Sequence, residues 1–112
     1  MGLDIIIYEK EPVICPHCKT IVGYNTVDEV ASGGKDWYDF LENIKYYIPY
    51  EKWNKNKHEA SWYGQDMILT FEQATNMVKF ARQHKVYNYY EIEQLVRDTK
   101  LEGHSIVINA DW

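Results

Sequence analysis

The chain contains 112 residues with a formal net charge of −5, and 46% of its residues are hydrophobic against 26% charged. This length and composition fit a single domain over residues 1–112 with enough apolar surface to repay the entropy of ordering, and they exclude a disordered chain. The acidic balance also argues against broad, direct binding to nucleic-acid phosphates.

The first apolar segment is too short to cross a membrane. Leu3–Tyr8 (LDIIIY) is β-branched, which is typical of a buried strand, and no charged leader precedes it. The chain is therefore expected in the cytoplasm. Glu9–Pro12 looks like a turn, and Thr20–Tyr24 looks like a second strand that can continue through Val27 and Val30.

A glycine-containing breaker separates this predicted hairpin from a helix. Ser32-Gly33-Gly34 interrupts the strand pattern, and Asp36–Tyr47 has apolar residues at helical spacing. The apolar face of this helix contains Trp37, Phe40, Leu41 and Ile44. Pro49 ends the segment, and the polar stretch Tyr50–Gly64 is predicted to be a long ordered loop in which partner contacts are expected.

Two helices and a closing strand are predicted in the last third of the chain. Thr70–Gln73 has the pattern of a capping box, and Asn88–Glu91 repeats this start signal before a helix that Gly103 ends. The apolar faces contain Phe71, Ala74, Met77, Val78 and Ala81 in the first helix and Ile92, Leu95, Val96 and Thr99 in the second. Ser105–Ile108 is predicted to be a strand. The expected fold is α+β, with a short sheet (a hairpin plus the C-terminal strand) packed by about three helices.

The motif Cys15-Pro16-His17-Cys18 has the spacing that lets two thiolates bind one metal ion. In a cytoplasmic chain, a close cysteine pair favours a metal or redox site over a structural disulfide. The two-residue gap aims backbone N–H groups at the sulfur atoms, zinc takes four ligands in a tetrahedron, and the charge of Lys19 favours the thiolate. The motif predicts a zinc knuckle that stabilises the domain, with Cys15 and Cys18 as ligands.

The motif leaves two zinc ligands to be found, because the chain has no second Cys-x-x-Cys. They must come from His, Asp or Glu side chains, or from a second copy of the chain. Asp4 is a candidate, because a hairpin turn at residues 9–12 would return it close to His17 and Cys18.

The long loop offers two further candidates, His58 and Asp66, whereas His84 and His104 lie near helix ends and are predicted to be surface residues. A redox-active pair and two unligated buried cysteines stay open as alternatives to zinc. Lys19–Tyr24, however, looks like a strand and not like the helix that a thioredoxin-like site needs. Neither His-Glu-x-x-His nor a deaminase signature is present, so the zinc is predicted to be structural and the chain not to be an enzyme.

Several short motifs occur together over about the first two thirds of the chain. They are Met1-Gly2-Leu3-Asp4-Ile5, Cys15-Pro16-His17-Cys18, Ser32-Gly33-Gly34 followed by Trp37-Tyr38, Tyr46-Tyr47-x-Pro-Tyr50, and Trp62-Tyr63-Gly64-x-Asp66-Met67. This series resembles a group of small bacteriophage and prophage proteins. Among phage accessory proteins of this size, the chain resembles the type II-A anti-CRISPR inhibitors, at least one of which contains zinc and binds Cas9.

The resemblance implies a zinc-containing protein of the bacterial host cytoplasm that binds a CRISPR effector, above all Cas9, and turns over no substrate. It also implies Asp4 and Asp66 as the remaining zinc ligands. Acidic charge and aromatic residues would steer such a protein to the basic surfaces of an effector. Two other functions stay open. One is a nucleic-acid-binding or regulatory zinc module, which would need a basic stripe, and the other is a small metalloenzyme, which would need an exchangeable water on the metal.

Overall fold

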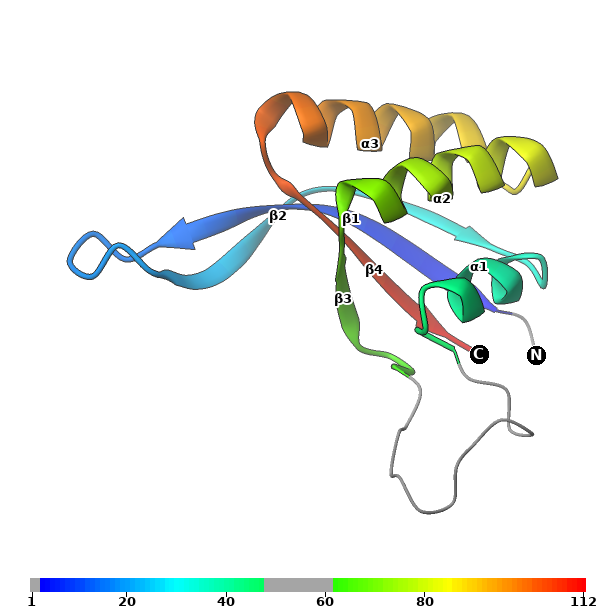
Figure 1. Ribbon diagram of the computed structural model, residues 1–112, viewed down its shortest axis with the longest axis horizontal. Coiled ribbons are helices and arrows are strands. Elements are labelled where there is room, and N and C mark those ends of the chain that lie inside the picture. Colours follow the sequence, from blue (N-terminus) through cyan, green and yellow to red (C-terminus); the bar gives the residue numbers. More distant parts are fainter. Residues whose placement is uncertain (1–2, 48–61) are drawn as a thin grey trace, which may run out of the picture.

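In the computed structural model, which describes residues 3–47 and 62–112, four strands form one antiparallel sheet. In chain order the elements are β1 (Asp4–Ile14), β2 (Ile21–Gly33), α1 (Trp37–Asn43), β3 (Asp66–Leu69), α2 (Phe71–His84), α3 (Tyr89–Glu102) and β4 (Ser105–Asp111). The strand order β2-β1-β4-β3 places the first and last strands side by side in the middle of the sheet (Figure 1). The predicted α+β class is confirmed.

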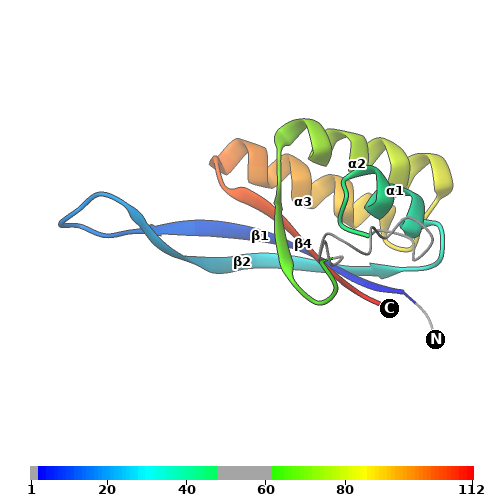
Figure 2. The same ribbon diagram turned by 60° about the horizontal axis from the view of Figure 1, so that its bottom comes forward.

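The helices of the described chain lie on one face of the sheet (Figure 2). Successive strand residues point to opposite faces. The positions of β1 and β4 that face the helices are Ile5, Ile7, Ile106, Ile108 and Ala110, and all are buried. They belong to one core with Met77 of α2 and Leu95 of α3. Burial of this apolar surface, at about 25 cal/mol per Å², is the main source of stability.

Both helices predicted in the last third are present. The hydroxyl of Thr70 accepts the N–H of Gln73 at 3.1 Å, and the Gln73 side chain accepts the N–H of Thr70 at 2.9 Å, so the capping box is confirmed. Gly103 ends α3 at a φ of +70°. The predicted face of α3 is buried throughout, at Ile92, Leu95, Val96 and Thr99. In α2, Phe71 departs from the predicted face, because it is exposed.

The start of α3 lies where it was predicted but is fixed by a different contact. Asn88 adopts a φ of +63°, and its side chain makes no capping hydrogen bond to the helix. Its amide instead donates to the carbonyl of Ala31 at 3.1 Å. The predicted capping role of Asn88 is therefore wrong, and the residue ties the beginning of α3 to β2.

The helix predicted over residues 36–47 is shorter than expected and ends at Asn43. Lys45 has a φ of +62°, and the N–H of Tyr46 donates to the carbonyl of Leu41 at 2.8 Å, so the chain turns back on itself. The predicted apolar face is nevertheless buried at all of its positions, Trp37, Phe40, Leu41 and Ile44.

The first strand is longer than predicted, and the turn of the hairpin lies elsewhere. Residues 9–12, predicted as a turn, continue β1 as far as Ile14, with Pro12 opposite Tyr24. A proline is accepted here because β4 pairs with β1 only up to Lys10, and edge positions tolerate a residue without an N–H. The prediction of a turn at Glu9–Pro12 is therefore wrong, because these residues pair with β2 as part of β1.

The β1–β2 pairing contains two register shifts, which leave Val22 and Val27 of β2 without a direct partner in β1. Such bulges add one residue to a strand and increase its twist. The second predicted strand is confirmed, and it continues through Ser32 and Gly33, which were predicted to interrupt it.

One short strand was not predicted. β3 pairs antiparallel with β4, from Asp66 opposite Asn109 to Leu69 opposite Ile106. Most of the loop predicted over Tyr50–Gly64 lies outside the described residues. In the part of the chain that the structure describes, no helix is long and apolar enough to span a membrane.

Candidate metal centre

The β1–β2 hairpin projects beyond the rest of the sheet (Figure 1). β4 stops pairing with β1 at Lys10, so residues 11–25 form a two-stranded ribbon with no third strand among the described residues. We call these residues the distal ribbon. Its exposed apolar side chains are Val13, Ile14, Ile21, Val22 and Tyr24. Two-stranded ribbons are marginally stable alone in water, and contiguous exposed apolar residues mark surfaces suited to contact with another molecule.

The predicted cysteine pair lies in the turn at the end of the distal ribbon. The N–H of Cys15 donates to the carbonyl of Thr20, and the N–H of Lys19 donates to the carbonyl of Cys15, both at 2.9 Å. Lys19 closes the turn in a left-handed conformation with a φ of +60°. Cys15 is half-buried, Cys18 is exposed, and both are free thiols. The turn therefore presents two thiols within one short loop open to solvent.

Hydrogen bonds favour the ionised form of Cys18. Its Sγ lies 2.8 Å from Oγ1 of Thr20. This hydroxyl is the largest cause, followed by the Thr20 backbone and the Cys15 thiol, of a pKa of Cys18 lowered from 9.0 to about 7. The expected contribution of the Lys19 charge is not among the causes. Because the thiolate is the form that binds metal, the turn has the ligand chemistry that the motif predicts.

In the metal-free chain, alkylation of Cys18 by iodoacetamide should reach half of its maximal rate near pH 7, because the thiolate reacts and its pKa is lowered to about 7. Thr20→Val removes the hydroxyl that contributes most, so the midpoint should move toward 9.0. Mass spectrometry over a series of pH values measures the rate at each cysteine. Thr26→Val is the matched control and should leave the midpoint unchanged. Equal midpoints for Cys18 with and without the Thr20 hydroxyl would contradict this assignment.

The structure does not bring Asp4 to the cysteines. Asp4 begins β1, at the end of the sheet opposite the turn, where it pairs with Gly33 and Asp111. Since a strand rises about 3.3 Å per residue, Asp4 and Cys15 are on the order of 35 Å apart. The predicted proximity depended on a turn at residues 9–12, and it is wrong because those residues continue the strand.

Asp66 is engaged elsewhere as well. Its carboxylate accepts hydrogen bonds from Nζ of Lys10 and Nδ2 of Asn109, both at 2.9 Å. Burial opposes the ionisation of Asp66, but these two hydrogen bonds and the Lys10 charge outweigh burial and lower its pKa. The carboxylate links β1, β3 and β4 within the sheet, so its predicted place beside the cysteines is wrong.

The cysteine turn supplies half of a tetrahedral ligand set. Among residues 3–47 and 62–112, no group of three or more His, Cys, Asp and Glu side chains is arranged to hold a metal ion. His17 is therefore not grouped with Cys15 and Cys18 in the described chain, and His58 lies outside the described residues. Zinc uses four ligands in structural sites. Zinc binding by the two cysteines stays a prediction, and its other ligands must come from elsewhere.

One histidine that was predicted to lie on the surface is part of the core boundary. Nδ1 of His104 lies 2.6 Å from Oε2 of Glu9, whose side chain is only 5% exposed. His84 is exposed, as predicted. Glu9 follows Ile5 and Ile7 on the buried face of β1. A carboxylate in this alternating apolar series was the available signal for a polar partner across the core.

Acidic and aromatic side chains gather at the end of the sheet opposite the cysteine turn. Asp4 and Asp111 are direct cross-strand partners in β1 and β4, and both are exposed. Trp112 directly follows Asp111 at this end of the sheet, and its ring centroid lies 4.9 Å from that of Tyr63. We call the following six residues the acidic–aromatic surface: Asp4, Asp66, Asp111, Trp62, Tyr63 and Trp112.

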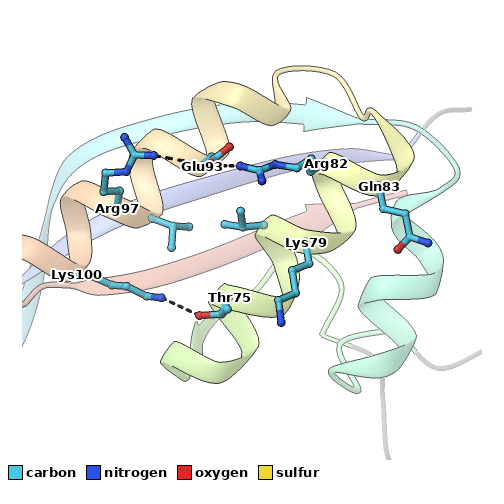
Figure 3. A pocket seen from close by; sticks show the side chains of 9 residues that line it. Thr75, Lys79, Arg82, Gln83, Glu93, Arg97 and Lys100 are labelled. Atoms are coloured by element: carbon cyan, nitrogen blue, oxygen red, sulfur yellow. Dashed lines mark hydrogen bonds and ion pairs between the residues drawn. The ribbon is translucent and has the colours of Figure 1, made fainter.

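A cleft of about 570 Å³ lies between α2 and α3 (Figure 3). The basic residues on its rim are Lys79, Arg82, Arg97 and Lys100. Arg82 of α2 is paired with Glu93 of α3 and lowers the pKa of that carboxylate through their hydrogen bond. Nζ of Lys100 donates to the hydroxyl of Thr75 at 2.7 Å. These contacts tie the two helices together, so the cleft is best explained as a helix–helix junction.

No protein-family model matches the chain, and neither a curated protein nor a solved structure matches it. The resemblance to anti-CRISPR proteins consequently stays a prediction from the sequence motifs. Two features of the molecule bear on function: the cysteine turn with its distal ribbon, and the acidic–aromatic surface at the other end of the sheet.

Proposed function

We propose that the chain is a zinc-containing inhibitor that binds a CRISPR effector, such as Cas9, and blocks its engagement of target DNA. It acts by binding, without turnover, in the cytoplasm of the bacterial host cell. The proposal is supported by the resemblance of the sequence motifs and by one structural observation, the acidic–aromatic surface.

The acidic part of this surface suits a basic partner. Asp4 and Asp111 face each other across β1 and β4, and like charges at directly opposed positions destabilise a sheet. A partner that carries Lys or Arg side chains would relieve this repulsion. The nucleic-acid channel of an effector is such a surface, because it binds phosphate backbones. The net charge of −5 would also increase the rate of encounter with a basic protein.

The aromatic part of the surface supplies contact area. Trp62 is 40% exposed and Tyr63 is 51% exposed. Trp and Tyr are enriched among the interface residues that carry most of the binding free energy. Charge would therefore set the approach and orientation, while the aromatic side chains would slow dissociation.

Zinc would act on the fold of the hairpin, because the cysteine turn and the acidic–aromatic surface lie at opposite ends of β1. Cys15 and Cys18 would hold the ion as thiolates. A metal that binds only the folded chain stabilises it by mass action. Zinc would thus keep the distal ribbon ordered. It would take no direct part in the contact between the acidic–aromatic surface and the effector.

Reversing both opposed charges, Asp4→Lys with Asp111→Lys, should raise the concentration needed to inhibit Cas9 by about tenfold or more, because electrostatic attraction becomes repulsion. Stability should stay the same, since the pair remains like-charged. The measurement is cleavage of target DNA by purified Cas9 and guide RNA at increasing chain concentration and at several salt concentrations. The matched control is Glu29→Lys with Glu102→Lys, which changes the net charge equally at exposed positions elsewhere.

Equal losses in the two double variants would show that the acidic–aromatic surface has no special role. Cleavage that persists at large excess for Cas9 proteins of several hosts would refute the inhibitor proposal. The remaining candidate would then be a zinc-bearing regulatory or nucleic-acid-binding phage protein, which a salt-dependent mobility shift of single-stranded DNA or RNA would support.

A further inference from the structure

The cysteine turn offers zinc two ligands, while a structural zinc site uses four. Within residues 3–47 and 62–112, no third His, Cys, Asp or Glu is arranged with Cys15 and Cys18 to hold a metal ion. Where the described chain resumes after residue 61, it joins the other end of the sheet. There the N–H of Gly64 donates to the carbonyl of Ala110, which lies opposite Ile5. The described chain therefore provides two of the four zinc ligands and leaves the other two to a second molecule.

The surface beside the turn is apolar and lacks a covering element. Ile14 and Ile21 are cross-strand partners next to the turn, and they are 56% and 55% exposed. Val22, next to Ile21, is also exposed, whereas Val13, next to Ile14 in β1, points to the opposite face of the distal ribbon. Covering such surface removes apolar side chains from water and therefore favours association. A molecule that completes the zinc coordination would bury these side chains at the same time.

We infer that a second copy of this chain completes the site, so that one zinc ion binds Cys15 and Cys18 of both copies across a two-fold axis. The inference rests on the metal site of the proposed function. Symmetry turns two ligands into four, because each copy supplies the same pair, and four thiolates form a closed structural zinc site. Each thiol that binds the metal releases its proton to the solvent.

Charge and shape beside the turn also fit a symmetric pair. Zinc with four thiolates carries a net charge of about −2, because each thiolate contributes one negative charge. Lys19, exposed next to Cys18, would bring one compensating positive charge from each copy. The same two-fold axis would set Ile14 and Ile21 of one distal ribbon against their equivalents in the other.

The test uses the full chain loaded with Zn²⁺ in the absence of any effector. Native mass spectrometry and sedimentation should give twice the 13.3 kDa mass of one chain, with one zinc ion for two chains. EDTA should return single copies. Cys15→Ser and Cys18→Ser should each lack zinc and remain single copies. Their far-UV circular dichroism should keep the helical signal, because the turn projects away from the helices (Figure 1).

His17→Ala and His58→Ala are the matched controls, and both should keep the zinc ratio and the doubled mass. One zinc ion in a single chain, zinc lost with either histidine, or a doubled mass that survives EDTA would each overturn the sharing of zinc between copies. Absence of zinc binding by the unaltered chain would overturn both the sharing and the metal site. None of these outcomes depends on inhibition of Cas9, so the two proposals can fail separately.

Discussion

Trp37→Ala should lower the free energy of unfolding by about 3–5 kcal/mol, because it removes a fully buried aromatic side chain and leaves a cavity. The ring centroid of Trp37 lies 5.8 Å from that of Phe40 and 5.2 Å from that of Phe80. Its Nε1–H donates to the hydroxyl of Ser32 at 3.0 Å. One residue therefore joins α1, α2 and β2. A domain of this size has about 5–15 kcal/mol of stability in total, so the variant should be close to unfolding.

Urea denaturation followed by circular dichroism measures this loss. Tyr87→Ala is a suitable control, because the side chain is 71% exposed and its removal should change stability by no more than about 0.5 kcal/mol. If the two variants unfold at the same urea concentration, Trp37 does not anchor the core in the way described here.

His104→Ala should destabilise the chain by about 3 kcal/mol, because it leaves the buried carboxylate of Glu9 without the imidazole 2.6 Å away. Every buried side-chain N or O atom in the described part of the chain has a hydrogen-bond partner. In the variant, the buried carboxylate of Glu9 would lack the partner that it has in the unaltered chain. Leaving a buried charge without a partner is among the few single changes that cost this much.

The matched control is His84→Ala, the same substitution at an exposed position, which should change stability by no more than about 0.5 kcal/mol. The double variant Glu9→Leu with His104→Ala should recover part of the loss, because both polar partners are then absent. Chemical denaturation of the three variants measures the difference. Similar stabilities of His104→Ala and His84→Ala would show that Glu9 does not depend on the imidazole.

Local patterns predicted the helical part of the fold well. The periodicity of α2 and α3, the capping box at Thr70 and the glycine at Gly103 each act within a few residues, so the sequence window contains the interaction that decides them. Asn88 shows the limit of this reasoning. It has the composition of a cap, but a contact with Ala31, far away in sequence, determines its side-chain position.

The hairpin could be predicted only in part, because pairing between strands is not local. The Glu-Lys-Glu-Pro sequence of residues 9–12 is polar and contains a proline, which resembles a turn. Its pairing with β2 overrides this preference, and bulges at Val22 and Val27 set a register that no alternation rule indicates. The predicted proximity of Asp4 to the cysteines depended on that turn and is therefore also wrong.

The candidate metal site was also predicted only in part, because some of its features are local in sequence and others are not. The spacing of Cys15 and Cys18 is local, and the structure places both in one turn whose hydrogen bonds favour a thiolate. The additional ligands depended on tertiary positions, and Asp66 is held instead by Lys10 and Asn109. β3, with four residues, was too short to show a clear strand period, so the place of Asp66 in the sheet was not predictable.

The central position of β4 has a consequence for how the chain folds. The pairing of Asp4 with Asp111 joins residues from nearly opposite ends of the sequence, and β4 also provides the partner of β3. Contacts at such separation carry a large loop-closure entropy and slow the folding rate. Until β4 inserts, β1 and β3 each present an unpaired edge, and such edges are templates for aggregation. The interval between synthesis of the hairpin and insertion of β4 is thus the stage at which this chain is most exposed to misassembly.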